Sequence, residues 1–221
     1  MAELITPQQL HEADGVEDWR VVGEGVCAYF RTGSFATGAR FLGAISELAG
    51  LDDYHHPDVD VRYGGMTVRL ITILDGYYGL TERDVELARQ SSAVARELGL
   101  PADPSVVQNV QVSIDALVGP EVLPFWRAVL GYCDRGDYPE DLIDPRGRGP
   151  LVYFQQMDAP RPQRNRIHLD VWVAHDQAET RVAAAIAAGG RLVSDDHAPS
   201  WWVLTDAEGN EACVCTWLVR D

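Results

Sequence analysis

Asp52-Asp53-Tyr54-His55-His56-Pro57 and Gly79-Leu80-Thr81-Glu82-Arg83-Asp84 are the two stretches that decide the fold of the first half of this chain. The first stretch places two histidines side by side, between two acids and a proline. Histidine is the side chain best suited to moving protons near neutral pH. Proline fixes its own φ and restricts the preceding residue to extended backbone. The first stretch therefore predicts an acid–base site on a rigid turn.

Two interpretations of this histidine pair remain open. Adjacent side chains on a regular strand point to opposite faces, so His55 and His56 can serve one site only if the backbone turns there. Asp52 and Asp53 can orient an imidazole or raise its pKa. The structural alternative is that one histidine belongs to a hydrogen-bond network and the other lies in a solvated loop.

The rest of the first half alternates helices and strands. Thr6, Pro7 and Gln9 are typical of a helix start with a capping box. The expected elements that follow are strands over 19–31, a helix over 35–49, strands over 59–74 and a helix over 82–98. One face of the 59–74 strands is formed by Met66, Val68, Leu70, Thr72 and Leu74. This order predicts an α+β domain, with an antiparallel sheet and helices on one face.

A break follows at Leu98-Gly99-Leu100-Pro101-Ala102-Asp103-Pro104. The glycine ends a helical pattern and the two prolines prevent its continuation. We expect a first domain over residues 1–100, a linker over 101–106 and a second domain over 107–221. A chain of 221 residues is long enough to form two ordinary cores.

The second half contains an approximate internal repeat. The expected elements of its first unit are a strand over 108–115, a helix over 120–131 and strands over 140–144 and 150–158. Those of its second unit are a strand over 165–174, a helix over 176–189 and strands over 190–194, 200–205 and 211–217. Two such units predict a paired βαβββ domain whose curved sheets enclose a ligand cleft.

Composition limits the partners. The chain has 18 basic and 34 acidic side chains and a formal net charge of -16. Such a surface repels phosphate backbones and anionic membranes, so nucleic acid and membranes are disfavoured. We find neither a leader segment nor an apolar run near the ~18–20 residues of a membrane span, and expect a cytoplasmic protein. The four cysteines lack C-x-x-C spacing, which favours buried, reduced thiols.

The segment from Thr6 to Leu100 resembles the pterin-4a-carbinolamine dehydratase family. The resemblance rests on Trp19, on His55-His56-Pro57 and on the run from Gly79 to Asp84 with its continuation to Ala88. It implies a dehydratase without metal or cofactor, which removes water from a 4a-hydroxytetrahydropterin to give the quinonoid dihydropterin. The histidines would assist loss of the 4a-hydroxyl and of the N5 proton.

The chain departs from this family at two positions. Family members usually carry a third histidine shortly before Gly-Leu-Thr, where this chain has Asp75. Aspartate can act as a base, but its unperturbed pKa near ~3.9 makes it a weak acid at pH 7. Leu51 replaces the family's usual acid, and Asp52 or Asp53 can substitute for it. Asp84 is either the helix-capping acid or a site residue. The implied catalytic residues are His55, His56, Asp75 and Asp84, with Asp52, Asp53 and Pro57 against the substrate.

Residues 107–218 resemble the vicinal oxygen chelate superfamily, which includes glyoxalase I, extradiol dioxygenases and bleomycin-resistance proteins. The resemblance rests on three runs, over residues 125–131, 166–171 and 205–214. Metal-using members place one ligand on the first strand and one on the last strand of each repeat. These positions fall on Asn109 or Gln111, on Gln155 or Gln156, on His168, and on Cys213 with Glu211 two residues earlier.

Amide oxygens are weak metal ligands, so we expect a cleft without metal. Its ligand-binding residues would be Gln111, Gln155, His168 and Glu211, and a metal, if present, would bind His168, Glu211 and Gln155. Trp201 and Trp202 are adjacent on a strand, so one belongs to the core and the other faces the cleft or solvent. We take Trp202 as the cleft residue, which favours a flat, aromatic ligand.

Three functions are compatible with these patterns. The first is a dehydratase-like lyase with an appended ligand-binding domain. The second is a metal-free protein that sequesters an aromatic natural product or drug, with the first half as a dimerisation scaffold. The third is a metal-dependent lyase, isomerase or dioxygenase. In each case we expect a small-molecule partner, pterin-like or flat and aromatic, and a homo-oligomer.

Overall fold

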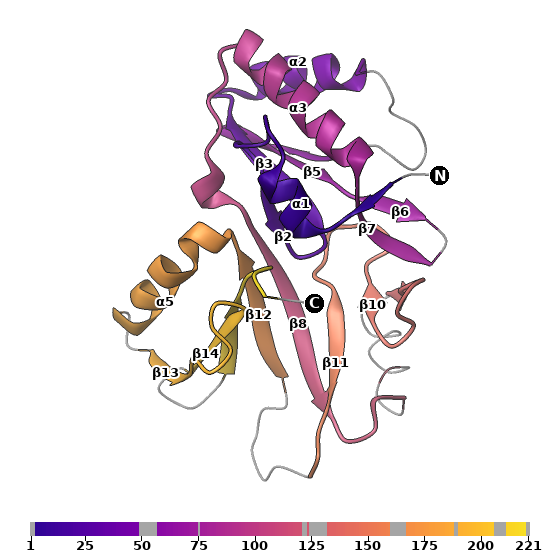
Figure 1. Cartoon of the computed structure of the whole chain (residues 1–221), viewed down its shortest axis with the longest axis vertical. Coiled ribbons are helices and arrows are strands. Elements are labelled where there is room, and N and C mark those ends of the chain that lie inside the picture. The colour runs from indigo at the N-terminus through magenta and orange to yellow at the C-terminus, as the bar shows by residue number, and fades with distance from the viewer. Residues whose placement is uncertain are drawn as a thin grey trace. The chain divides into compact units, whose positions relative to one another are not determined.

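The computed structural model describes residues 3–48, 57–74, 76–120, 123, 132–159, 167–187, 190–205 and 211–219. It divides into two compact units, Met1–Val107 and Gln108–Asp221. Each unit contains sheets and helices, which confirms the predicted α+β class (Figure 1). No helix within the described ranges is long and apolar enough to cross a membrane.

Two antiparallel sheets form the first unit, with the strand orders β2-β3-β5-β4 and β1-β7-β6. Their strands are β1 (Leu4–Ile5), β2 (Arg20–Val22), β3 (Gly25–Arg31), β4 (Asp58–Val61), β5 (Gly65–Leu70), β6 (Thr72–Leu74) and β7 (Tyr77–Thr81). The run predicted over 59–74 is therefore divided between the two sheets. β5 pairs with β3 and β4, and after Ile71 the chain continues as β6, which pairs with β7.

The helices of this unit are α1 (Pro7–Glu12), α2 (Phe35–Ser46) and α3 (Glu82–Glu97), followed by a short 3-10 helix, η1 (Pro104–Val106). α2 and α3 contact each other and β5, so both cover the same face of the four-stranded sheet (Figure 1). α1 begins with the predicted capping box. The Gln9 N–H donates to Thr6 Oγ1 at 3.2 Å, and the Thr6 N–H donates to Gln9 Oε1 at 2.8 Å.

The core of the first unit lies between the helices and the four-stranded sheet. Phe30 of β3 and Phe41 of α2 are fully buried, and their rings meet edge to face with centroids 5.1 Å apart. The buried face of β5 is the one that the alternation predicted, with Met66, Val68 and Leu70 inside. Full burial of each such side chain contributes about 1.5–3 kcal/mol.

The segment predicted as a linker, residues 101–106, lies within the first unit. The Arg31 N–H donates to the Pro101 carbonyl at 2.9 Å, and the Asp103 N–H donates to the Tyr29 carbonyl at 2.8 Å. These bonds attach the segment to β3. The two compact units meet between Val107 and Gln108, directly after this segment.

One eight-stranded sheet forms the second unit, in the order β13-β14-β15-β12-β8-β11-β10-β9. Its strands are β8 (Gln108–Ala116), β9 (Cys133–Asp134), β10 (Leu142–Ile143), β11 (Val152–Gln156), β12 (Ile167–Val173), β13 (Arg191–Ser194), β14 (Trp201–Thr205) and β15 (Glu211–Cys215). β8 and β12 pair antiparallel at its centre. β8 also pairs in parallel with β11, and β12 pairs in parallel with β15.

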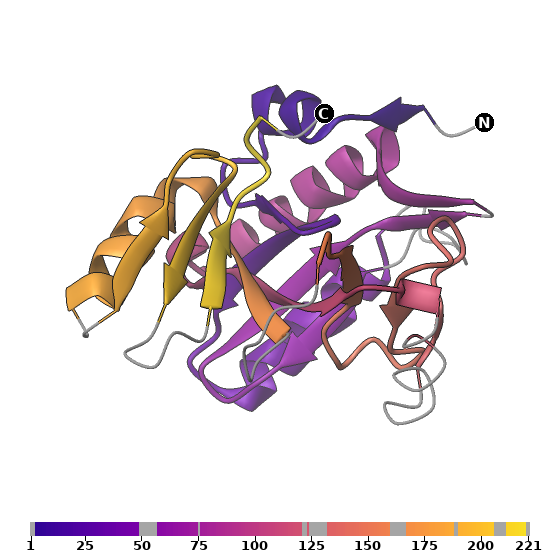
Figure 2. The same ribbon diagram turned by 90° about the horizontal axis from the view of Figure 1, so that it is seen from below.

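This pairing confirms the predicted repeat at the level of the strands. In each half, the first strand pairs in parallel with the last, and the two halves meet at β8 and β12. The helix predicted over 120–131 lies largely outside the described residues. The helix predicted over 176–189 is present as η2 (His175–Gln177) followed by α5 (Ala178–Ala187), which lies beside β13 and β14 (Figure 2).

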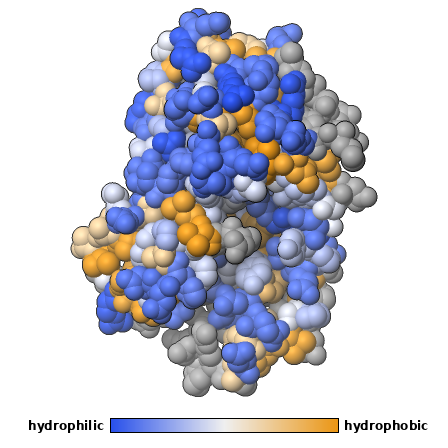
Figure 3. Space-filling model, in the orientation of Figure 1, coloured by the Kyte–Doolittle hydropathy of each residue, from blue (hydrophilic) through white to orange (hydrophobic). Residues whose placement is uncertain are grey.

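Alternation along the strands gives this sheet two chemically different faces. α5 packs on the apolar face, where Val182 of the helix meets Val173, Leu204 and Val214 of the sheet. The opposite face bears polar side chains at its centre. On the outside of the molecule, Figure 3 shows a mainly hydrophilic surface on the viewed side, with smaller apolar patches.

Two glycines of α2 provide a matched test of the packing in the first unit. A Cβ at Gly38 would lie 2.7 Å from Val61 Cγ1 on β4, whereas a Cβ at Gly43 would meet nothing within 4 Å. We expect Gly43→Ala to raise the free energy of unfolding of this unit by about 0.5–1 kcal/mol. Gly38→Ala should lower it by roughly 1–3 kcal/mol, because β4 must move away. Urea unfolding followed by circular dichroism measures both, and equal effects would contradict the close helix–strand contact.

Candidate functional site

A buried carboxylate lies where β6, β7 and α3 meet. Asp84 is 1% exposed. Its Oδ2 accepts hydrogen bonds from Thr81 N at 2.8 Å, from Thr81 Oγ1 at 2.9 Å and from Thr72 Oγ1 at 2.8 Å. Thr81 is the N-cap of α3 and Asp84 is the third residue of that helix. The carboxylate thus caps the helix, complements its dipole and attaches it to β6.

Tyr77 contacts the first residues of the run from Gly79 to Asp84. Its hydroxyl donates to the Leu80 carbonyl at 2.7 Å, and its ring lies so close to Gly79 that a Cβ there would be 2.5 Å from the hydroxyl oxygen. Burial raises the pKa of Tyr77. The glycine at this position therefore makes room for the tyrosine ring.

Trp19 belongs to the core of the first unit. It is 2% exposed, its indole N–H donates to Ser92 Oγ on α3 at 3.0 Å, and its ring meets Phe30 edge to face at 6.3 Å. The tryptophan on which part of the sequence resemblance rests is therefore a packing residue that joins the sheet to α3.

Comparison with known proteins identifies this unit. Residues 3–94 match the family model described as Pterin 4 alpha carbinolamine dehydratase. A Nocardia farcinica protein provisionally named as a pterin-4-alpha-carbinolamine dehydratase is 34% identical over 95 residues, which cover 42% of this chain and 97% of that protein. The chain belongs to the pterin-4a-carbinolamine dehydratase family. Proteins with the same provisional name from Aquifex aeolicus and Haloarcula marismortui are 31% and 30% identical, over 43% and 42% of this chain and 94% and 98% of their own lengths.

Most of the site residues predicted for the dehydratase-family domain lie outside the described residues: the catalytic candidates His55, His56 and Asp75, and the substrate-binding candidates Asp52 and Asp53. Pro57 is described, is partly buried and directly precedes β4. Asp84 is described, and its contacts are those of a helix cap. These contacts are those of the helix-capping role, one of the two roles that the sequence left open for Asp84.

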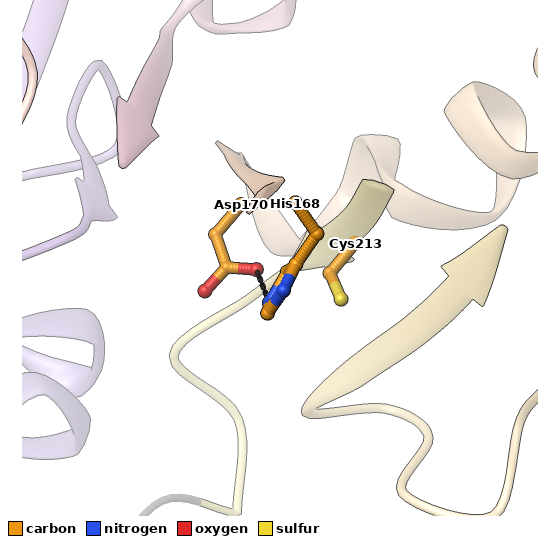
Figure 4. Close-up of side chains that lie close together, drawn as sticks. All are labelled: His168, Asp170 and Cys213. Atoms are coloured by element: carbon orange, nitrogen blue, oxygen red, sulfur yellow. Dashed lines mark ion pairs between the residues drawn. The ribbon is translucent and has the colours of Figure 1, made fainter. Parts of the chain in front are cut away.

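The second unit has a cluster of reactive side chains on the polar face of its sheet. His168 on β12 pairs with Ser113 on β8, and Asp170 on β12 pairs with Cys213 on β15. Directly paired residues share a face, so the four side chains lie on one side of the sheet. Figure 4 shows His168, Asp170 and Cys213 close together. Their potential ligand atoms all lie within 4.8 Å of one another.

His168 lies between two carboxylates. Its Nε2 is 3.4 Å from Asp170 Oδ1 and its Nδ1 is 3.8 Å from Asp115 Oδ1. The hydroxyl of Ser113 donates to the other oxygen of Asp170, Oδ2, at 3.1 Å. Interaction with the Asp170 carboxylate raises the pKa of His168, although burial acts in the opposite direction. The surroundings therefore favour the protonated imidazole.

Cys213 is held as a neutral thiol by the same surroundings. It is 8% exposed, and burial, with the nearby Asp170 charge second, strongly raises the pKa of its thiol. A thiol in this state is a poor nucleophile at neutral pH.

An aromatic wall borders this cluster. Trp172, Trp201 and Val203 pack around Cys213 and Cys215 on the polar face. The ring of His197 stacks on Trp201, with centroids 4.2 Å apart and an interplanar angle of 21°. The polar face thus has ionisable side chains at its centre and flat aromatic side chains beside them.

Residues 111–215 match the family model described as Glyoxalase-like domain. A solved structure of a glyoxalase/bleomycin resistance protein/dioxygenase superfamily member from Vibrio splendidus 12B01 is 17% identical and covers 50% of this chain and 99% of its own, with a TM-score of 0.30. At that TM-score the overlap adds nothing on the fold. The similarity of this domain to glyoxalase-like domains rests on the family match.

Four of the predicted ligand-binding residues share the polar face. Gln111 pairs with Asp170, Gln155 pairs with Asp115, and Glu211 lies two residues before Cys213 on the same strand as it. His168 is at the centre of the face, and the side chains of Gln155 and Glu211 are exposed.

Trp202 differs from the other predicted residues. It packs with the apolar core under α5, whereas its neighbour Trp201 takes the polar face. The expectation that the two indoles lie on opposite faces is met, with Trp201 and not Trp202 beside the cluster.

The prediction from sequence did not include Ser113, Asp115 or Asp170. Their signal is present in the strands, because Gln111, Ser113 and Asp115 alternate with apolar residues on β8, as His168 and Asp170 do on β12. Polar residues at every second position of a strand mark a single polar face.

A second ionic cluster in this unit surrounds a buried arginine. Arg135 is 7% exposed, its Nη2 donates to Asp137 Oδ2 at 2.6 Å, and its Nη1 is 4.0 Å from Asp141 Oδ2. Burial raises the pKa of Asp141 to about 6, although Arg135 acts to lower it. The charged form of Asp141 is therefore disfavoured in the folded state.

The capping role of Asp84 can be tested by mutation. We expect Asp84→Ala to lower the free energy of unfolding of the first domain by roughly 1–3 kcal/mol or more, because the buried Thr81 N–H loses its acceptor. Glu82→Ala, on the exposed side of the same helical turn, should cost only about 0.3–1 kcal/mol through the helix dipole. Denaturant unfolding compares the two variants. An Asp84→Ala protein as stable as the wild type would refute the capping role.

The raised pKa of Asp141 predicts a pH dependence of stability. The folded pKa of about 6 lies above the ordinary value of 3.8, so between these values the folded state binds more protons than the unfolded state. The contribution of Asp141 to stability therefore falls as the pH rises from about 4 to about 6. Asp141→Asn removes this loss, so the variant should gain more melting temperature over the wild type at pH 7 than at pH 4. A difference independent of pH would contradict the raised pKa.

Proposed function

We propose that the dehydratase-family domain removes water from a 4a-hydroxytetrahydropterin to give the quinonoid dihydropterin. The observation that supports this most strongly is the match of residues 3–94 to the family, with 34% identity to a relative covered almost entirely. His55-His56-Pro57 and the run from Gly79 to Asp84 both lie within that match.

The reaction requires one proton donor and one proton acceptor. The C4a–oxygen bond breaks as a general acid protonates the leaving hydroxyl, which departs as water. A general base takes the N5 proton, and the nitrogen electron pair forms the C4a–N5 double bond. His55 and His56 are suited to these two roles, because imidazole exchanges protons near neutral pH. Asp75, with an unperturbed pKa near ~3.9, is suited only to the base role.

The described strands show where the segments that carry these positions join the fold. The chain enters β4 at Asp58, which pairs with Arg69 near the end of β5 and forms an ion pair with it at 2.9 Å. From that end of β5, the chain passes through Ile71 into β6, whose last residue, Leu74, directly precedes Asp75. The segment that bears the histidine pair thus leads into β4, and Asp75 directly follows β6.

We propose small-molecule binding for the glyoxalase-like domain as well. The aromatic wall of Trp172 and Trp201 beside the cluster around His168 supports a flat ligand with a polar edge. We further propose that the protein acts in the cytoplasm as a homo-oligomer, and that the dehydratase reaction itself uses no cofactor.

The dehydratase proposal is tested by turnover of a 4a-hydroxytetrahydropterin generated in situ. We expect His55→Ala and His56→Ala each to reduce kcat/KM by about 10²–10⁴-fold, the usual contribution of a general acid or base. His11→Ala, in the exposed last turn of α1, serves as the matched control and should retain the wild-type rate. Equal rates in all four proteins, or no turnover by the wild type, would refute the proposal.

A further inference from the structure

We propose that β13 (Arg191–Ser194) is the edge at which two copies of this chain pair, antiparallel and about a two-fold axis near Val193. The two eight-stranded sheets then join into one continuous sheet. This inference rests on the proposed homo-oligomer and names its contact surface. It is independent of the dehydratase reaction, because β13 belongs to the glyoxalase-like domain.

The outer edge of β13 is the first observation in support. β13 is the last strand at one end of the sheet, and among the described strands it pairs only with β14 (Figure 1). Every second residue of such a strand directs its backbone N–H and C=O groups away from the sheet, where another strand can bind them. The strand at the other end of the sheet, β9, has only two residues. β13 therefore offers the longer of the two edges.

The second observation is the apolar character of the middle of β13. Leu192 is 43% exposed and Val193 is 54% exposed. The register with β14 shifts between Leu192 and Ser194, and a bulge of this kind changes the direction of the side chain within it. Edge strands are usually protected by charged side chains or proline, and the middle of β13 has two apolar residues instead. These residues suit contact with a second apolar strand.

α5 extends the apolar surface beside β13. The two elements contact each other, and the Gly190 N–H donates to the Ala185 carbonyl at 3.0 Å where they connect. Ile186 of α5 is 42% exposed. Leu192 lies on the face that α5 covers, because it pairs with Leu204, a core residue under that helix. Antiparallel pairing of two identical edges keeps like faces together, so Ile186 and Leu192 of both copies lie on one side of the joined sheet.

The charges at the two ends of β13 favour a second copy as its partner. Arg191 begins the strand, Asp195 and Asp196 directly follow it, and all three side chains are exposed. Antiparallel pairing of two copies brings the basic start of each strand beside the acidic end of the other, twice by symmetry. Parallel pairing would place like charges together. Because the chain has a net charge of -16, contact between two copies requires local complementarity of this kind.

Sedimentation of the full-length protein over a range of concentrations tests the proposal. The wild type should be a dimer or a larger assembly. Val193→Lys should weaken self-association by about 100-fold or more, because two like charges would meet in the contact near the axis. Val118→Lys, at a residue of the same domain that is 46% exposed, is the matched control and should leave the Kd of self-association unchanged.

A charge exchange tests the antiparallel direction and keeps the test decisive if Val193→Lys does not fold. Arg191→Asp should weaken self-association by about 2–30-fold, because two exposed ion pairs are lost. Arg191→Asp combined with Asp195→Arg should return the Kd toward the wild-type value, because the exchanged charges attract each other again. Circular dichroism verifies that each variant keeps its fold.

Cysteine cross-linking locates the contact directly. In a Cys133→Ser background, which removes the exposed cysteine, Val193→Cys should form a disulfide-linked dimer under mild oxidation and Val118→Cys should not. Opposite Cα atoms of paired strands are about 4.5–5.5 Å apart, within reach of a disulfide. A monomeric wild type would overturn both this contact and the homo-oligomer. An assembly that Val193→Lys leaves intact, that the charge exchange does not restore, or that Val193→Cys does not cross-link would overturn the β13 contact alone.

Discussion

The antiparallel pairing of β8 with β12 is the interaction on which the second half of this protein depends. Its register runs from Ile167 opposite Ile114 to Val173 opposite Gln108. Because paired residues share a face, this register sets Gln111, Ser113 and Asp115 of β8 on the side that bears His168 and Asp170. A shift of one residue would place the same polar groups against α5. The apolar core and the ionisable cluster are thus two consequences of one register.

In the first half, the run from Gly79 to Asp84 has structural contacts that can be described residue by residue. At the end of the second motif, the Asp84 carboxylate accepts hydrogen bonds from Thr81, where α3 begins, and from Thr72 on β6. These bonds begin the helix and attach it to that strand. Tyr77 uses the space that Gly79 leaves open. In the proposed reaction, the histidine pair and Asp75 are the candidates for proton transfer, while the described contacts of Asp84 are those of a helix cap.

The two domains differ in how their buried carboxylates are paired with hydrogen-bond donors and charges. In the dehydratase-family domain, the buried carboxylate of Asp84 accepts hydrogen bonds from the hydroxyls of Thr72 and Thr81 and from the Thr81 backbone N–H. In the glyoxalase-like domain, Asp170 and Asp115 flank one imidazole, and the buried oxygen of Asp170 lacks a hydrogen-bond donor within the described structure. A carboxylate satisfied by neutral donors stabilises the fold, whereas Asp170 and Asp115 stabilise a positive charge on the imidazole between them.

The sequence by itself determined the class of both domains and most of their local structure. Thr6 and Gln9 predicted the first helix start, alternation predicted the buried face of β5, and the internal repeat predicted the two related halves of the second unit. These features depend on neighbours in the chain, so they are visible in residue order. The tertiary structure decided which face of β14 Trp201 occupies, how residues 101–106 attach to β3, and that Asp170 and Cys213 lie opposite each other. A period of two shows that adjacent side chains oppose each other, but the face that each takes is fixed only by the register with a distant strand.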